Sequence, residues 1–266
     1  MTPITAAEFQ RFQRFIFDSA GITMSDAKKP LVCGRLSKRL AAHRCDSFGA
    51  YFELLNGPQG AAEAQVAIDL LTTNETYFFR EPKHFELLRR LATEAAAQGR
   101  ALRVWSAASS SGEEAYSIAM VLADCMGSAP WEVLGSDISQ RVLQRARTGH
   151  YMMERARHIP PAYLKRYCLR GTGTQEGTLL VDKALRQRVQ FAQVNLNTAL
   201  PQLGSFDLVF LRNVMIYFNG DTKRQVVARV VALLKPGGHL CIGHSESLND
   251  VSNAVTAVAP SIYRKP

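Results

Sequence analysis

The first seventy residues carry apolar positions at helical spacing and no β-type run. Phe9, Phe12 and Ile16 share one helical face. Thr5 and Glu8 stand where a capping box would begin that helix. Further helical patterns follow, at residues 30–43, 48–55 and 61–71. We therefore expect a separate N-terminal helical domain over residues 1–73.

Beyond residue 100 the pattern changes to short β-type apolar runs that alternate with helical runs. This alternation is typical of a mostly parallel sheet covered by helices on both faces. A glycine-rich stretch, Gly171–Gly177, has no strand before it and suits a hairpin loop. The sequence thus predicts an α/β domain over residues 74–266, with a small inserted β-subdomain at 165–190.

One βαβ unit, Arg103–Asp137, contains the strongest chemical signal. Its first strand enters a loop of small residues, where a backbone approaches a ligand closely. Its second strand ends on Asp137, a carboxylate suited to accept hydrogen bonds from ribose hydroxyls. We therefore expect a ligand that contains a nucleoside.

The start of the helix in this unit favours one kind of nucleoside ligand. Glu113 and Glu114 follow a loop that has a single glycine, Gly112. A pyrophosphate cofactor requires bare amides and would be repelled by two carboxylates, whereas a carboxylate attracts the ammonium group of an amino acid. S-adenosylmethionine fits this pattern better than NAD does. The plain alternative is a surface turn whose Glu pair is favoured by the helix dipole.

Charge and composition limit the other possibilities. Lys and Arg number 32 against 23 Asp and Glu, a net charge of +9, which favours an acidic partner: nucleic acid, an anionic surface or a Glu-rich protein. Arg35, Lys38 and Arg39 share a helical face that is either solvated or a docking surface. The five cysteines form no Cys-x-x-Cys pair and the histidines are scattered, so no metal site is expected. Neither a membrane span nor a signal peptide is apparent, and we expect a cytoplasmic protein.

Several motifs in order resemble the CheR-type chemotaxis protein methyltransferases, which are protein-glutamate O-methyltransferases. They are Asn74–Arg80, Trp105–Ala108, Ser111–Ser117, Ser136–Ile138, Arg170–Gly173, Arg212–Phe218, Leu234–Gly238 and Gly243–Glu246. The resemblance covers nearly the whole chain. It implies a Rossmann-like, seven-stranded methyltransferase sheet that uses S-adenosylmethionine, a helical N-terminal domain and a small inserted β-subdomain.

The resemblance also implies roles for individual residues. Glu113, with Glu114 as the alternative, would hold the methionine ammonium, and Asp137 the ribose. The remaining cofactor and substrate pocket would comprise Asn74, Thr76, Arg80, Asn195, Leu196, Arg212, Asn213 and Tyr217. We expect Arg80 and Tyr217 to be catalytic, because a guanidinium offers a planar fork to the incoming carboxylate and a tyrosine hydroxyl can hydrogen-bond near the transfer site. The product would be S-adenosylhomocysteine.

The expected chemistry needs alignment more than acid or base groups, since a free Glu is already ionised at neutral pH. Glu-rich receptor helices would suit the face of Arg35, Lys38 and Arg39, and the inserted β-subdomain would suit a receptor tail. Two other functions stay open on the residues alone. One is a nucleic-acid methyltransferase, although no base-methylation motif is apparent, and the other is a cofactor-binding module without catalysis.

Overall fold

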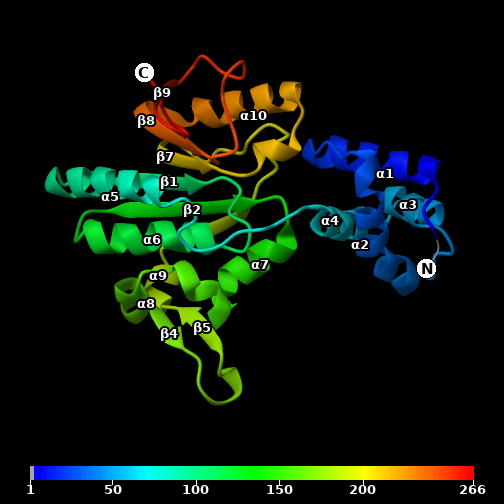
Figure 1. The fold of residues 1–266 in the computed structure, drawn as a ribbon, viewed down its shortest axis with the longest axis horizontal. Coiled ribbons are helices and arrows are strands. Elements are labelled where there is room, and N and C mark those ends of the chain that lie inside the picture. The colour runs from blue at the N-terminus through cyan, green and yellow to red at the C-terminus, as the bar shows by residue number, and fades with distance from the viewer. Residues whose placement is uncertain (1–2) are drawn as a thin grey trace. The chain divides into compact units, whose positions relative to one another are not determined.

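The computed structural model describes residues 3–266 and divides into two compact units (Figure 1). The first unit takes the chain up to Thr73 together with a later segment, Tyr217–Lys223. The second takes Asn74–Ile216 and Arg224–Pro266. The first unit is therefore built from two stretches that lie far apart in the sequence.

The helical unit follows the apolar periodicity of its sequence. Thr5 and Glu8 form the expected capping box, in which the Thr5 side chain accepts from the Glu8 amide and the Glu8 carboxylate accepts from the Thr5 amide at 2.8 Å. Ser47 caps a later helix by accepting from the Ala50 amide at 3.0 Å. The elements are α1 (Ala6–Ala20), a 3₁₀ turn η1 (Asp26–Lys28), α2 (Lys29–Ala42), α3 (Phe48–Asn56) and α4 (Ala61–Leu71).

Aromatic side chains fill the centre of this unit. Phe12 is fully buried and meets the ring of Phe48 edge-on, with ring centroids 6.2 Å apart. The returning segment joins the unit through its backbone: Ile22 forms an isolated antiparallel bridge with Phe218, and the Thr23 amide donates to the Tyr217 carbonyl at 2.8 Å.

The second unit is organised around a seven-stranded sheet with the order β6-β2-β1-β7-β8-β10-β9. The strands β6, β2, β1, β7 and β8 run parallel, and β10 and β9 close the edge in antiparallel pairing. This confirms the predicted α/β methyltransferase-type sheet. The bounds are β1 (Leu102–Ser106), β2 (Trp131–Asp137), β6 (Val189–Gln193), β7 (Phe206–Leu211), β8 (Leu234–Ile242), β9 (Thr256–Ala259) and β10 (Ile262–Arg264).

Helices pack on the sheet through apolar faces. α6 (Glu113–Cys125) is buried along most of its length, and α5 (Pro82–Ala97) packs beside it. The other helices of this unit are α7 (Gln140–Thr148), α8 (Pro161–Tyr167), α9 (Lys183–Arg186) and α10 (Gly220–Ala232), with the 3₁₀ turns η2 (Met153–His158), η3 (Gly173–Gln175) and η4 (Met215–Tyr217). The first residues of α10 and the last of η4 belong to the segment that groups with the helical unit.

A small antiparallel sheet lies between β2 and β6 in the sequence, with the order β3-β5-β4. Its strands are β3 (His150–Met152), β4 (Cys168–Arg170) and β5 (Thr178–Val181). The hairpin expected around Gly171–Gly177 joins β4 to β5. The sheet starts at His150, before the range of 165–190 expected for the inserted subdomain. The sequence did not indicate this first strand, because three residues are too few to carry a period-two signal.

None of the helices in residues 3–266 has the length and apolar character that a membrane crossing requires.

Candidate functional site

The loop after β1 is fixed by the two strands beside it. The Ala107 amide donates to the Phe210 carbonyl at 2.9 Å, and the Ser109 amide donates to the Ser136 carbonyl at 2.8 Å. The loop ends at Gly112, which has a φ of 96°. A β-carbon at Gly112 would lie 2.9 Å from the β-carbon of Ala146, so only glycine fits there. The loop is thus a rigid platform at the carboxyl ends of the parallel strands.

Asp137 ends β2 and reaches back to this loop. Its carboxylate accepts from the Ser110 amide at 2.9 Å and from the Ser139 amide at 3.0 Å. Ser110 is a non-glycine residue with a positive φ, 48°, a strained conformation that this bond helps to hold. Asp137 therefore has a fixed orientation at the edge where ligands of open α/β sheets bind.

Glu113, in the first turn of α6, is fully buried. Its carboxylate accepts from the Ser111 hydroxyl at 2.7 Å and from Nε of Arg155 at 2.6 Å. Arg155 also donates to the Thr76 carbonyl at 2.9 Å. This ion pair consequently links the start of α6 to the segment 74–80.

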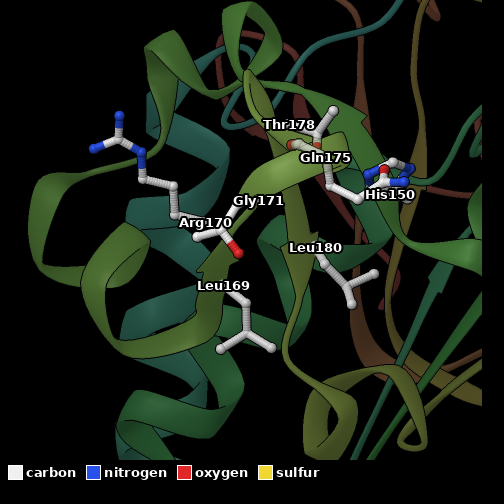
Figure 2. A pocket seen from close by; sticks show the side chains of 8 residues that line it. His150, Leu169, Arg170, Gly171, Gln175, Thr178 and Leu180 are labelled. Atoms are coloured by element: carbon white, nitrogen blue, oxygen red, sulfur yellow. Dashed lines mark hydrogen bonds between the residues drawn. The ribbon is translucent and has the colours of Figure 1, made fainter.

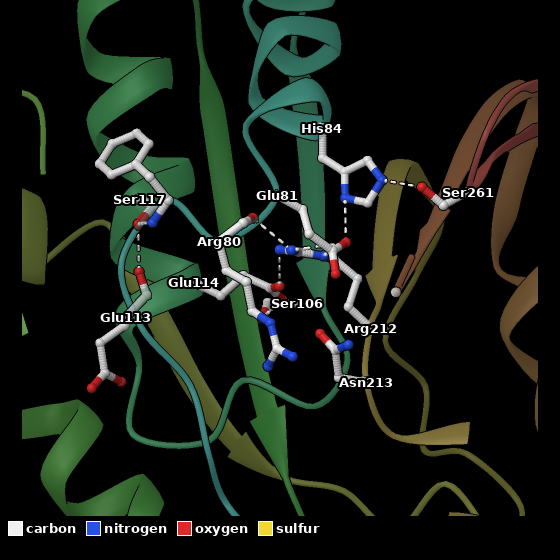
Figure 3. A network of polar contacts seen from close by, with 12 residues as sticks. Arg80, Glu81, His84, Ser106, Glu113, Glu114, Ser117, Arg212, Asn213 and Ser261 are labelled. Carbon is white, nitrogen blue, oxygen red and sulfur yellow. Dashed lines mark hydrogen bonds and ion pairs between the residues drawn. The ribbon is translucent and has the colours of Figure 1, made fainter. Parts of the chain in front are cut away.

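Glu114 points to a different set of partners (Figure 3). It accepts from the Ser106 hydroxyl at 2.6 Å and from Arg212 Nη1 at 2.8 Å. Arg212 follows β7, its side chain is 2% exposed, and it also lies 3.1 Å from an oxygen of Glu81. Burial raises the pKa of the Glu114 carboxyl, and the Arg212 guanidinium opposes that rise. Arg212 is therefore enclosed between two carboxylates.

Arg80 differs from Arg212 in how its guanidinium is used. The Arg80 carbonyl accepts from Arg212 Nη2 at 2.5 Å, while its side chain points away from Arg212 (Figure 3). The guanidinium lies 3.4 Å from the Glu75 carbonyl oxygen and 5.5 Å from the centre of the Tyr77 ring. Arg80 makes no ion pair with any residue in the described part of the chain.

The segment that carries Arg80 is held by its backbone. The Asn74 carbonyl accepts from the Ser110 hydroxyl at 2.9 Å, and the Phe79 amide donates to the Ser117 hydroxyl at 3.0 Å. Phe78 is fully buried. Asn74, Thr76 and Arg80 thus lie along the loop that carries Ser110 and along the first turns of α6.

The remaining expected residues follow strands β6 and β7. Asn195 comes just after β6, where its side chain accepts from the Asn197 amide at 2.9 Å, and Leu196 is buried. Asn213 has a φ of 56°, and its amide donates to Glu246 at 2.9 Å. Tyr217 belongs to the segment that groups with the helical unit, whereas the other expected pocket residues belong to the second unit.

Three residues of this network were missed in the sequence. Glu81 and Arg155 bind the expected residues Arg212 and Glu113, and neither stands at a motif position that signals this. Glu246 accepts from the amides of Asn213 and Gly243, at 2.9 and 2.7 Å, and fixes the turn after β8. Glu246 is the last residue of the Gly243–Glu246 motif, so the sequence did mark its position, although the motif alone assigned it no role.

The chemistry of this edge fits S-adenosylmethionine. Asp137 offers a fixed carboxylate at a strand tip, and Glu113 offers another at the start of α6. The loop between them has one glycine and two buried carboxylates at its end, which disfavours a pyrophosphate. The residues present therefore suit a ligand that joins a ribose to an ammonium group.

The face of Arg35, Lys38 and Arg39 lies on α2. Arg35 donates to the Leu71 and Thr72 carbonyls, both at 3.0 Å, and so binds the end of α4. Arg39 donates to Glu63 through Nε at 2.7 Å. Lys38 is exposed. Two of the three charges therefore have partners inside the helical unit.

Comparison with known proteins agrees with this architecture. Residues 74–263 match the model of the CheR methyltransferase, SAM binding domain, and residues 7–72 match that of the CheR methyltransferase, all-alpha domain. The chemotaxis protein methyltransferase of Escherichia coli (strain K12) is 43% identical over 98% of this chain and 91% of its own length. Chemotaxis protein methyltransferase 2 of Pseudomonas aeruginosa is 43% identical over 97% of this chain and 93% of its own. The chain carries a domain that binds S-adenosylmethionine and belongs to the CheR methyltransferase family.

Proposed function

We propose that this protein methylates glutamate side chains of chemoreceptors in the cytoplasm, with S-adenosylmethionine as methyl donor. The names of its relatives support a role in chemotaxis. The observation that carries the substrate class is Arg80: a half-buried guanidinium beside the loop after β1, without an ion-pair partner in residues 3–266. A guanidinium in such a place suits an incoming carboxylate, which it binds through two parallel hydrogen bonds.

The proposed cofactor site uses the carboxyl edge of the sheet. Asp137 would bind the ribose hydroxyls, and Asn195 with Leu196 would flank the adenine. Asn74, Thr76 and Asn213 would line the remaining pocket. Arg212 would support the pocket without contacting the ligand, because its guanidinium already binds Glu114 and the carbonyl of Arg80.

Glu113 is the better candidate for the methionine ammonium. Glu114 is paired with the enclosed guanidinium of Arg212, which has little freedom to move. The partner of Glu113, Arg155, has a side chain that is 38% exposed and can be displaced more easily. A ligand ammonium would then take the place of Arg155 on a carboxylate that is already desolvated.

The bound cofactor supplies a methyl group on a sulfonium, which is activated for displacement. The residues of the chain have to align the attacking carboxylate and exclude water. Since an unperturbed Glu has a pKa of about 4.3, no side chain has to remove a proton first. We assign the alignment to Arg80 and a hydrogen bond at the transfer site to Tyr217.

The small sheet is the proposed contact for a receptor tail. A hollow of about 400 Å³ lies along β4 and β5 (Figure 2), where Arg170 pairs with Leu179 and the Gly171 amide donates to the Thr178 carbonyl at 2.9 Å. β4 is an edge strand, and Leu169 on it is 54% exposed. An extended peptide can pair with such an edge and place alternate side chains in the hollow.

Methyl transfer to isolated receptor membranes tests the function. The chain would be incubated with S-adenosylmethionine labelled in its methyl group, and base-labile label on the receptor would be measured, because methyl esters hydrolyse in base. We expect label with the wild type and at least a tenfold lower rate with Arg80→Ala. Arg90→Ala, which changes an exposed arginine on α5, is the matched control.

A second measurement separates cofactor binding from transfer. Calorimetry with S-adenosylhomocysteine should give weaker binding to Asp137→Asn and wild-type binding to Asp18→Asn, an exposed aspartate of α1. If the wild type binds this ligand but labels nucleic acid instead of the receptor, the glutamate substrate is wrong. If it binds the ligand and labels neither, the chain is a binding module.

A further inference from the structure

Glu81 and His84, at the start of one helix, meet the distant His244 beside Arg212. Glu81 precedes α5, His84 lies in its first turn, and His244 follows β8. Oε2 of Glu81 is 3.5 Å from Nδ1 of His84 and 3.9 Å from Nε2 of His244. The three potential ligand atoms all lie within 4.8 Å of one another.

The hydrogen bonds of His84 define which of its nitrogens is available. The Ser261 hydroxyl lies 2.7 Å from the Pro260 carbonyl, which can only accept, so its hydrogen is assigned to that bond. With the hydrogen assigned in this way, the hydroxyl oxygen, which is 2.8 Å from Nε2 of His84, accepts from that nitrogen. In a neutral imidazole with its hydrogen on Nε2, Nδ1 holds a free lone pair.

Nδ1 of His84 is the unusual atom of this cluster. The residue has no exposed surface, and Nδ1 is a buried polar atom without a hydrogen-bond partner among the described residues. It faces the carboxylate of Glu81 (Figure 3), so a lone pair and a negatively charged oxygen are opposed. Buried polar atoms are normally satisfied, and a cation between these two atoms would satisfy both.

We propose that Glu81, His84 and His244 bind a divalent transition-metal ion of the Zn²⁺ type. Two imidazoles and one carboxylate are a known ligand set for Zn²⁺, with the fourth position left to water. Imidazole nitrogen disfavours Mg²⁺ and Ca²⁺, which select oxygen ligands. Ser261 would orient His84 through Nε2, as second partners of metal-bound histidines commonly do.

The distances need only small adjustments for such an ion. Ligand atoms of a tetrahedral zinc site lie about 3.3 Å apart, as bonds of about 2.0 Å imply. The Glu81–His84 separation of 3.5 Å is already close to this value, and His244 has a side chain that is 51% exposed and can rotate inward. His244 is also positioned by its own backbone, since its amide donates to Oε1 of Glu81 at 3.2 Å.

Arg212 is the group that opposes metal binding. Its Nη2 lies 3.1 Å from Oε2 of Glu81, so a bound ion would share this oxygen with a guanidinium. Hard cations that bind mainly by charge should not overcome this repulsion. An ion with strong bonds to two imidazoles is favoured over them, which further restricts the site to transition metals.

Metal titration of the purified full chain tests the proposal. Zn²⁺ would be added in a buffer without chelators, and the melting temperature and the heat of binding would be followed. We expect Zn²⁺ to raise the melting temperature, and Mg²⁺ to leave it unchanged. His244→Ala should weaken Zn²⁺ binding by at least about tenfold, since even losing a second partner of a ligand costs that much. His150→Ala removes an exposed histidine of β3 and should bind as the wild type does.

Cobalt distinguishes this site from the five cysteines of the chain. Co²⁺ at two imidazoles and a carboxylate should give visible absorption without a thiolate charge-transfer band, and the absorption should disappear in His244→Ala. Equal Zn²⁺ binding by the wild type and His244→Ala would overturn the proposal, as would a thiolate band in the Co²⁺ spectrum or no stabilisation by Zn²⁺. Circular dichroism should show that His244→Ala keeps the native fold, because its side chain is half exposed.

Discussion

Arg212 and Glu114 form a buried ion pair, in which Nη1 donates to Oε2 at 2.8 Å. The same guanidinium donates to the Arg80 carbonyl at 2.5 Å. Arg212 therefore acts as a brace between α6 and the segment that carries Arg80. Arg212 stabilises the fold, and it influences the site by holding the backbone of Arg80 in place.

Glu114→Gln should destabilise the chain by about 3 kcal/mol, because a buried guanidinium loses one of its two anionic partners. Urea unfolding at neutral pH measures this loss. Glu86→Gln, on the exposed face of α5, should change the unfolding free energy by no more than about 0.5 kcal/mol. An unchanged value for Glu114→Gln would mean that its carboxyl is protonated in the folded protein.

Glu113→Gln should weaken cofactor binding. The change removes the charge that we assign to the methionine ammonium, so binding of S-adenosylhomocysteine should weaken by roughly tenfold, equivalent to about 1.4 kcal/mol. Calorimetry of Glu113→Gln beside Glu114→Gln measures this. If Glu114→Gln, corrected for its folded fraction, loses more affinity than Glu113→Gln, the two roles must be exchanged.

Glu63 makes the helical unit sensitive to acid. Burial alone would raise the pKa of Glu63, but hydrogen bonds from Arg39, Tyr51 and His43 outweigh it and lower the pKa to about 2. A carboxyl whose pKa is lowered by folding contributes stability above its unfolded pKa and loses it as the pH falls toward the folded one. Stability should therefore decline between pH values of about 4.5 and 2, by up to about 3 kcal/mol.

Urea unfolding at a series of pH values measures this decline. Glu63→Gln should be less stable at neutral pH and should flatten the acid limb of the curve. Glu53→Gln is the control, since its pair with Arg11 is exposed and contributes little. An acid limb that is as steep in Glu63→Gln as in the wild type would assign the effect to other carboxyls.

Lys38 and Arg39 should separate receptor docking from stability. Lys38 is exposed, whereas Arg39 binds Glu63. Lys38→Glu should slow receptor methylation several-fold at low salt, and by less at high salt, without a change in cofactor affinity. Initial rates at two ionic strengths measure this effect, with Lys165→Glu on α8 as control. Equal rates for Lys38→Glu and the wild type would remove Lys38 from the docking surface.

Arg39→Ala should instead lower the unfolding free energy, because it leaves Glu63 without the guanidinium of Arg39.

Features that depend on neighbouring residues, such as helix caps and turns, could be predicted from the sequence. The capping box of Thr5 and Glu8 and the turn that ends at Gly112 both rest on neighbouring residues, and the structure contains each of them. The sheet was predictable because alternating strands and helices allow few arrangements.

The partners of individual charged residues were not predictable. Arg35 and Arg39 were grouped by their shared helical face, but whether a charge meets solvent or Glu63 depends on where another helix is packed. Glu81 and His84 stand three residues apart, but His244 lies about 160 residues further on, and only the fold brings it to them. Such contacts follow from the fold and not from any local pattern.

The return of Tyr217–Lys223 to the helical unit sets an order of assembly. Ile22 pairs with Phe218, so the unit cannot be finished until the chain has been synthesised well past β7. A ribosome therefore delivers the helices first, most of the sheet next, and the last piece of the helical unit only afterwards. For the same reason a cut at Thr73 does not release a complete module, and grafting residues 1–73 onto another enzyme would leave an edge of that module unpaired.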